Sequence, residues 1–323
     1  MNKYQRLFNQ AIEKNKRALT AEQVLKIQKL YLNTAKQLKK QLRNKKTNKI
    51  TRNWINSYLK SIKTYLDDLN KQLNQLSLKS LEDSAKEIAR IKKEVLKFEI
   101  KDVPDKYLSA CARVPKSAVE ALIKGTLYKD GKGLSERIWD LTKKYEKDIQ
   151  TVLIEGMSQG KTYTELMDDL NKYINPKAKK DWKWSKVYPG TSKTVDYNAQ
   201  RLVRTSINHA FFIGNIRSTQ DDPFATAIHW QLSSSHYERQ IVPFGPDECD
   251  DFATQDDYKL GTGNYPDDKV PTPHPNCLCT QYPVYDKSLT DIGKEINRWI
   301  KGEKNQKLDD WWENFVPSDY YTV

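Results

Sequence analysis

Residues 52–76, RNWINSYLKSIKTYLDDLNKQLNQL, carry apolar side chains at alternating spacings of four and three. The apolar positions are Ile55, Leu59, Ile62, Leu66, Leu69, Leu73 and Leu76. A heptad pattern held over about three repeats is typical of a helix that packs along one seam. Further apolar positions at Ile88, Ile91, Val95 and Phe98 extend this predicted helix towards Pro104.

The preceding stretch predicts a partner helix. Thr20-Ala21-Glu22-Gln23 has the form of a capping box, so we expect the helix to begin there. Apolar residues follow at helical spacing, at Val24, Ile27, Tyr31, Ala35, Leu38 and Leu42. The polar residues 44–48 suit a turn between two helices. We therefore expect an antiparallel helical hairpin in residues 1–103, its seam buried within one chain or, alternatively, in a dimeric coiled coil.

The formal charge of +13 is spread unevenly along the chain. Residues 1–100 contain 24 basic and 9 acidic side chains, whereas residues 219–323 contain 9 basic and 19 acidic ones. No acidic residue lies between Glu22 and Asp67, so ion pairs within that stretch cannot balance its charge. A polyanion is the simplest partner, and a solvated Lys-rich helix face is the alternative. If the partner is double-stranded DNA, we expect binding without sequence preference. The candidate contacts are Lys26, Lys29, Lys36, Lys39, Lys40, Arg43, Lys45, Lys46, Lys49 and Arg52.

Length and composition restrict the class of protein. A chain of 323 residues suggests two or three folding units. No apolar run approaches the roughly 20 residues that a membrane-spanning helix needs, and the polar N-terminus does not resemble a signal peptide. Four cysteines are too few for a disulfide framework. These features predict a protein that folds in a reducing cytoplasm and does not contact a membrane.

The middle of the chain, residues 104–220, predicts a helical domain. Short helices are expected at residues 118–123, closed by Gly125, from 134 to an end near 156–160, at 165–173 after a cap at Thr162 or Thr164, and at 194–219. Residues 176–193 form a basic, aromatic loop containing Trp182 and Trp184. These tryptophans either stack on nucleic acid or anchor the loop on its own domain.

Residues 221–286 contain the clearest chemical signal. His274, Cys277 and Cys279 lie within six residues, and Cys249 precedes them, which together supply a tetrahedral N/S ligand set for a structural Zn²⁺. His236 is an alternate ligand. Buried isolated thiols, or a disulfide from Cys249, are the alternatives. With β-prone runs at 227–230 and 282–285, the sequence predicts a small zinc-stapled irregular or β domain.

Signatures of catalysis are weak. There is no H-E-x-x-H motif. Residues 125–133 differ from a phosphate-binding loop in the spacing of the motif and in lacking its final Ser or Thr. We therefore expect no enzyme, and the alternative is a zinc-dependent nuclease or other DNA-acting enzyme that uses His229, His236 or His274. The fold class expected is mainly α with a small α+β C-terminal part.

The last segment, residues 287–323, is acidic and aromatic. Its rings are Trp299, Trp311, Trp312, Phe315, Tyr320 and Tyr321. A short segment cannot bury so many rings by itself, so they either pack on the chain's own helices or anchor a partner.

Several of these residues together resemble the C-terminal domain of tailed-phage minor head proteins, the head morphogenesis or minor capsid family. The matching strings are Trp230-Gln231-Leu232-Ser233, His236, Asp247-x-Cys249-Asp250, Gly261-x-Gly263-x-Tyr265-Pro266 and Pro273-His274-Pro275-Asn276-Cys277-Leu278-Cys279. Arg201-Leu202-Val203-Arg204-Thr205 is similar to the Ala-Arg-Thr-Glu helix before that domain, with Ser206 in place of Glu. The match covers roughly residues 150–285, and Phe252 stands where many members have a second Cys.

The resemblance implies a virion protein of few copies, located in the head interior near the portal after assembly in the host cytoplasm. The partners it implies are the portal protein and packaged DNA, with a major capsid or scaffolding protein as a further possibility. In such proteins the role is head assembly or DNA delivery at ejection.

Overall fold

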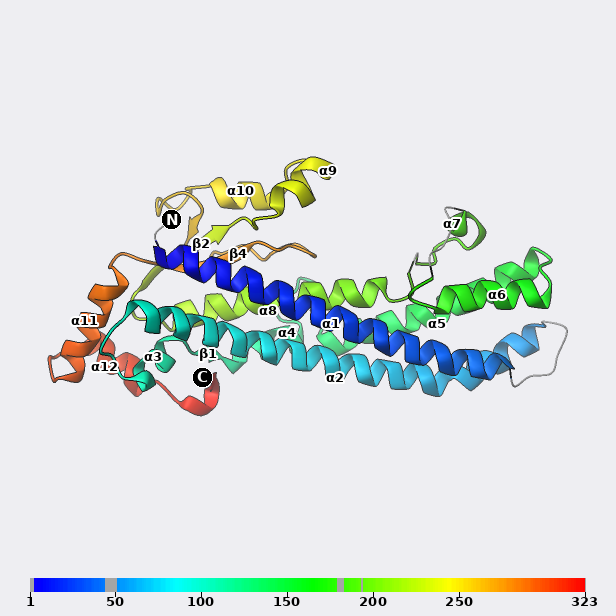
Figure 1. Ribbon diagram of the computed structural model, residues 1–323, viewed down its shortest axis with the longest axis horizontal. Coiled ribbons are helices and arrows are strands. Elements are labelled where there is room, and N and C mark those ends of the chain that lie inside the picture. The colour runs from blue at the N-terminus through cyan, green and yellow to red at the C-terminus, as the bar shows by residue number, and fades with distance from the viewer. Residues whose placement is uncertain (1–2, 44–50, 179–182, 193, 323) are drawn as a thin grey trace. The chain divides into compact units, whose positions relative to one another are not determined.

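The structure is a computed structural model that describes residues 3–43, 51–178, 183–192 and 194–322. The chain is mainly helical (Figure 1), which confirms the expected fold class at this level; of the described residues, 68% lie in helices and 6% in strands. Contacts divide it into two compact units. Unit 1 comprises Met1–Thr20, Ser80–Leu127 and Thr205–Val323, and unit 2 comprises Ala21–Lys79 and Tyr128–Arg204. This division differs from the four consecutive regions expected from sequence, because long helices cross from one unit to the other.

The helices are α1 (Lys3–Arg43), α2 (Arg52–Glu99), α3 (Asp105–Cys111), α4 (Lys116–Lys124), α5 (Leu134–Ser158), α6 (Tyr163–Ile174), α7 (Trp184–Val187), α8 (Tyr197–Gln220), α9 (Val242–Phe244), α10 (Glu248–Thr254), α11 (Leu289–Ile300) and α12 (Gln306–Glu313). A π-helical turn spans Tyr237–Ile241 and a 3₁₀ turn spans Pro317–Asp319. The strands are β1 (Val114–Pro115), β2 (Ala225–Gln231), β3 (Asn264–Tyr265), β4 (Thr280–Tyr285) and β5 (Tyr320–Tyr321). Among the described residues, no helix is both long enough and apolar enough to cross a membrane.

In unit 2 the heptad seam is buried within the single chain, as the intramolecular interpretation predicts. Five of its seven residues are fully buried, and Leu59 and Leu76 are half-buried. The facing part of α1 buries Ile27, Tyr31 and Leu38, and Tyr31 packs 5.5 Å from Tyr145 of α5. The turn predicted at residues 44–48 lies outside the described residues.

The predicted start of the first helix at Thr20 is wrong. Helix α1 already begins at Lys3, and the Thr20 hydroxyl donates to the carbonyl oxygen of Lys16 at 2.7 Å instead of capping. The earlier turns are stabilised because Tyr4, Phe8 and Ile12, spaced by four residues, bury one face of the helix.

In unit 1 the second half of α2 packs closely against α8. A Cβ atom added at Gly214 of α8 would lie 2.6 Å from the Ile88 side chain, so a larger residue there would force that side chain to move. A three-stranded antiparallel sheet in the order β3-β2-β4 lies in the same unit, and its two longer strands coincide with the two β-prone runs predicted from sequence.

The C-terminal segment folds back onto unit 1. Strand β5 pairs with β1 in antiparallel register, Val114 opposite Tyr321. Leu308 and Trp311 are buried, and the Arg113 guanidinium lies 4.6 to 5.6 Å from the ring centroids of Tyr320, Phe315 and Trp311. The intramolecular interpretation of this aromatic segment is therefore confirmed.

Candidate metal centre

Two short elements of unit 1 carry the candidate ligands. Cys249 lies in the first turn of α10, which begins where the Asp247 side chain accepts a hydrogen bond from the Cys249 amide at 2.9 Å. His274, Cys277 and Cys279 lie in the loop that leads into β4. That loop turns at Asn276, whose φ of +65° is left-handed, and the Cys277 amide donates to the His274 carbonyl at 3.1 Å. The turn therefore places His274 and Cys277 on the side of the loop that faces Cys249.

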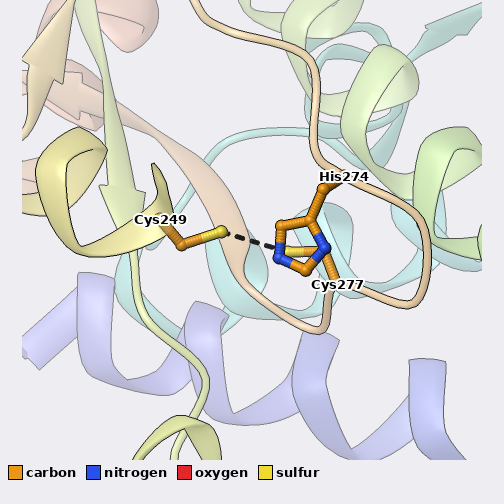
Figure 2. Close-up of side chains that lie close together, drawn as sticks. All are labelled: Cys249, His274 and Cys277. Atoms are coloured by element: carbon orange, nitrogen blue, oxygen red, sulfur yellow. Dashed lines mark hydrogen bonds between the residues drawn. The ribbon is translucent and has the colours of Figure 1, made fainter. Parts of the chain in front are cut away.

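Cys249, His274 and Cys277 point towards one another in Figure 2 and form a group that could hold a metal ion. One ligand atom from each lies within 4.8 Å of the others. The Sγ atoms of Cys249 and Cys277 are 3.6 Å apart, close to the roughly 3.8 Å separating two thiolates on a tetrahedral zinc with bonds of about 2.3 Å. A disulfide would need about 2.05 Å, and all four cysteines are free. The alternative of a Cys249 disulfide is therefore wrong, and the buried thiols of Cys249 and Cys277 lie in one cluster.

Cys279 is buried beside this group. Its backbone amide donates to Cys277 Sγ at 3.3 Å, and its own thiol interacts with those of Cys249 and Cys277. Hydrogen bonds from Cys249 and Cys279 hold the pKa of Cys277 well below its ordinary value. A hydrogen bond with Cys249 lowers the pKa of Cys279, but the Cys277 thiol and burial outweigh it and raise that pKa to about 11. The neighbouring thiols therefore favour the thiolate form of Cys277.

His236 lies in a neighbouring group. Its Nε2 is 3.1 Å from Asp250 Oδ2 and 3.9 Å from Asp247 Oδ1, and these three residues form a second set that could hold a metal. The other carboxylate oxygen of Asp247 lies 3.2 Å from His274 Nε2. Asp247 thus links the two groups, and it can orient His274 as carboxylates commonly orient metal-binding imidazoles.

The remaining histidines have structural partners. His209 of α8 is buried, with Nε2 2.9 Å from the Pro273 carbonyl, so it fixes the backbone next to His274. His229 of β2 has Nδ1 2.7 Å from Asn264 Oδ1 and packs on Tyr282, and burial lowers its pKa.

Sequence reasoning missed the contribution of α1. The Lys16 ammonium donates to the carbonyls of Leu278 and Cys279, both at 2.9 Å, and to Asn208 Oδ1 at 2.8 Å. Glu13 accepts hydrogen bonds from the Ser233 hydroxyl and the Ser234 amide, both at 2.8 Å. One signal was present in the sequence: Lys16 continues the four-residue spacing of Tyr4, Phe8 and Ile12, which places it on the buried face.

The predicted DNA contacts lie in unit 2. Lys29, Lys36, Lys39 and Lys40 of α1 and Arg52 of α2 are exposed, while Lys26 is half-buried and pairs with Glu22 at 2.5 Å. The side chain of Arg43 and residues Lys45, Lys46 and Lys49 lie outside the described part of the chain. In the basic loop, Trp184 is buried against Tyr188 and Tyr173, as the anchoring interpretation predicts, and Trp182 also lies outside the described residues.

Comparison with protein-family models, curated proteins and solved structures finds no match to this chain.

Proposed function

We propose that this chain is a structural minor capsid protein of a tailed phage, placed in the head near the portal, where it aids head assembly or DNA delivery. The observation that carries the proposal is the convergence of Cys249, His274 and Cys277. These residues belong to the sequence motifs that resemble the minor head family. Cys249 and Cys277 are 28 positions apart in the sequence, yet they lie in one small site. The portal protein and packaged DNA are the proposed partners, with a major capsid or scaffolding protein as a further one.

The proposed metal is Zn²⁺ in a structural role. Two or three cysteine sulfurs and one imidazole form a set that zinc prefers, and Cys279 is the proposed fourth ligand. With four protein ligands the site has no open position for a substrate. When bound, the ion would add folding energy to a segment of short strands and loops that has few apolar residues of its own.

Metal content tests this site directly. The purified chain should contain about one zinc ion per molecule by elemental analysis. The Cys277→Ser variant should lose it, because a hydroxyl is a poor replacement for a thiolate ligand, and its melting temperature should fall. Cys111→Ala is the matched control, since Cys111 is buried in α3 and is not among the proposed ligands. Wild-type protein that neither contains nor takes up zinc would refute the site.

The proposed place in the virion has a separate test. Quantitative mass spectrometry of purified particles produced with this chain should detect it at few copies per head. Particles formed in the presence of the Cys277→Ser variant should contain less of it, because the proposed metal loop would be misfolded. Complete absence of the wild-type chain from purified particles would refute a minor capsid role.

The runner-up function is a metal-dependent nuclease, and the group of His236, Asp247 and Asp250 favours it. Histidine and carboxylates can hold a divalent ion and activate water. Incubation of the purified chain with supercoiled plasmid and Mg²⁺, Mn²⁺ or Zn²⁺ separates the classes. The structural proposal expects no nicking, whereas nicking that disappears in Asp250→Asn would support the enzyme.

A further inference from the structure

We propose that Lys16 of α1 provides the positive charge that allows three thiolates, from Cys249, Cys277 and Cys279, to surround one buried metal ion. This inference rests on the proposed function of the site as a zinc centre. It assigns Lys16 as a positioning residue of the metal centre, located more than 230 positions before the first ligand in the sequence.

The first argument is burial. The Lys16 side chain is only 1% exposed, and a buried ammonium is costly unless it is both hydrogen-bonded and paired with a negative charge. Its three protons are all used, on Asn208 Oδ1, the Leu278 carbonyl and the Cys279 carbonyl. All three acceptors are neutral, so these bonds satisfy the hydrogen-bonding capacity of the ammonium but leave its charge to be balanced.

The second argument is the identity of the nearby anionic groups. Burial lowers the pKa of Lys16 to about 8, and the negative charges that oppose this shift are those of Cys277, Cys279 and then Glu13. Glu13 is itself engaged by Arg17 at 2.9 Å and by the serines of residues 233–234. The thiolates are therefore the groups that can balance the charge of Lys16.

The third argument is the charge of the centre itself. A divalent ion with three thiolates and a neutral imidazole has a net charge of −1, which is unfavourable in a buried site. One ammonium beside it makes the sum of these groups zero, to which the Asp247 carboxylate, 3.2 Å from His274 Nε2, adds one negative charge. The hydrogen bonds from Lys16 also fix the backbone at Leu278 and Cys279, directly after Cys277, so the same side chain holds the loop in the conformation in which Cys277 and Cys279 face Cys249.

The test compares Lys16→Gln with Lys14→Gln. Both remove one positive charge from the same helix, but Lys14 is exposed. Zinc affinity is measured by competition with a chromophoric chelator, and the Co²⁺-loaded proteins are compared by their sulfur-to-cobalt charge-transfer absorption. Lys16→Gln should bind zinc about 10- to 100-fold more weakly, as is usual on loss of a group that supports metal ligands. Its charge-transfer band should also weaken, because Cys279 no longer binds as a thiolate. Lys14→Gln should match the wild type in both measurements.

A second variant keeps the test decisive if Lys16→Gln does not fold. Cys279→Ser retains Lys16, and its cobalt charge-transfer band should lose about a third of its intensity, because one of three thiolates is gone. An unchanged band in Cys279→Ser, or equal zinc affinity of folded Lys16→Gln and wild type, would overturn the inference while the metal site itself stands. A wild-type chain that binds neither zinc nor cobalt would instead overturn the proposed function.

Discussion

The four cysteines show how the same side chain acquires different properties from its surroundings. Cys111 is buried in α3, and burial raises the pKa of its thiol, so it is a small packed side chain. Cys277 is equally buried, but neighbouring thiols hold its pKa low. The sequence predicted the ligand group at residues 274–279, because three soft ligands within six residues are a local pattern. It did not predict the roles of Glu13 and Lys16, because their partners lie more than 190 positions away and a Lys-rich helix favours an exposed interpretation.

Glu13→Gln tests the contact between α1 and the serine loop at residues 233–235. Burial raises the pKa of Glu13, but hydrogen bonds from Ser233 and Ser234 and the charge of Arg17 outweigh it, so the pKa is lowered from 4.5. The folded state therefore binds the proton more weakly than the unfolded state, and the carboxylate stabilises the fold above pH 4.5. At pH 7 the variant should lose about 1.5–3 kcal/mol of unfolding free energy in urea melts, which is the usual contribution of hydrogen bonds to a charged group.

The same variant has a defined pH dependence. The difference from wild type should shrink as the pH falls below 4.5 through the lowered pKa, where Glu13 becomes neutral in both states. Glu22→Gln is the control on the same helix, since Glu22 is exposed and pairs only at the surface with Lys26 in the described structure, so its change should be near zero. A Glu13→Gln difference that is constant from pH 7 to pH 3 would contradict the electrostatic explanation.

Among the elements, apolar periodicity predicted helices well and boundaries less well. Helices α4, α5 and α6 lie where the spacing of apolar residues places them, and Thr162 caps α6 as expected. The error at Thr20 arose because a Thr-x-x-Gln pattern can also occur inside a helix, where the hydroxyl bonds to the preceding turn. The two-residue strands β1, β3 and β5 were not predicted, since pairs this short depend on tertiary contacts rather than on local pattern.

The docking of the C-terminal segment provides a prediction at this level. Arg113 is buried among Trp311, Phe315 and Tyr320, and a planar guanidinium stacks on rings in a way that an ammonium does not. Arg113→Lys should therefore lower the unfolding free energy by about 1–2 kcal/mol and increase solvent quenching of tryptophan fluorescence. Arg6→Lys, at an exposed position of α1, should change neither quantity. If Arg113→Lys behaves like Arg6→Lys, ring packing alone holds the segment.

At the scale of the whole molecule, the division into units also divides the charge. Unit 2 contains 30 basic and 14 acidic residues, a net charge of +16, whereas unit 1 contains 25 basic and 28 acidic residues, a net charge of −3. The candidate metal centre therefore lies in the nearly neutral unit and the predicted DNA contacts lie in the basic one. The sequence indicated the basic stretch, but it did not indicate that residues 128–204 join it in one unit, because that grouping follows from tertiary packing.

If unit 2 holds packaged DNA, the salt dependence of binding should depend on its exposed lysines. Lys29, Lys36 and Lys40 lie at helical spacings of seven and four on α1, so they share one face, with Lys39 beside them. Each phosphate neutralised releases condensed counterions and contributes about 0.9 to the slope of log affinity against log salt. The triple change Lys36→Gln, Lys39→Gln and Lys40→Gln should therefore flatten the slope by roughly 3 if all three contact phosphates.

Fluorescence anisotropy with two unrelated duplexes of equal length measures both the slope and any sequence preference. The matched control changes three exposed lysines of unit 1 to Gln, namely Lys301, Lys304 and Lys307. These substitutions remove the same amount of charge as the α1 variant. The control should keep the wild-type slope, because a local contact rather than net charge sets the number of counterions released. Equal slopes for the two triple variants would mean that the α1 lysines only face solvent, and a strong preference for one duplex would contradict non-specific binding. Flattening only in the α1 variant would assign the DNA contact to unit 2, independently of the outcome at the metal centre.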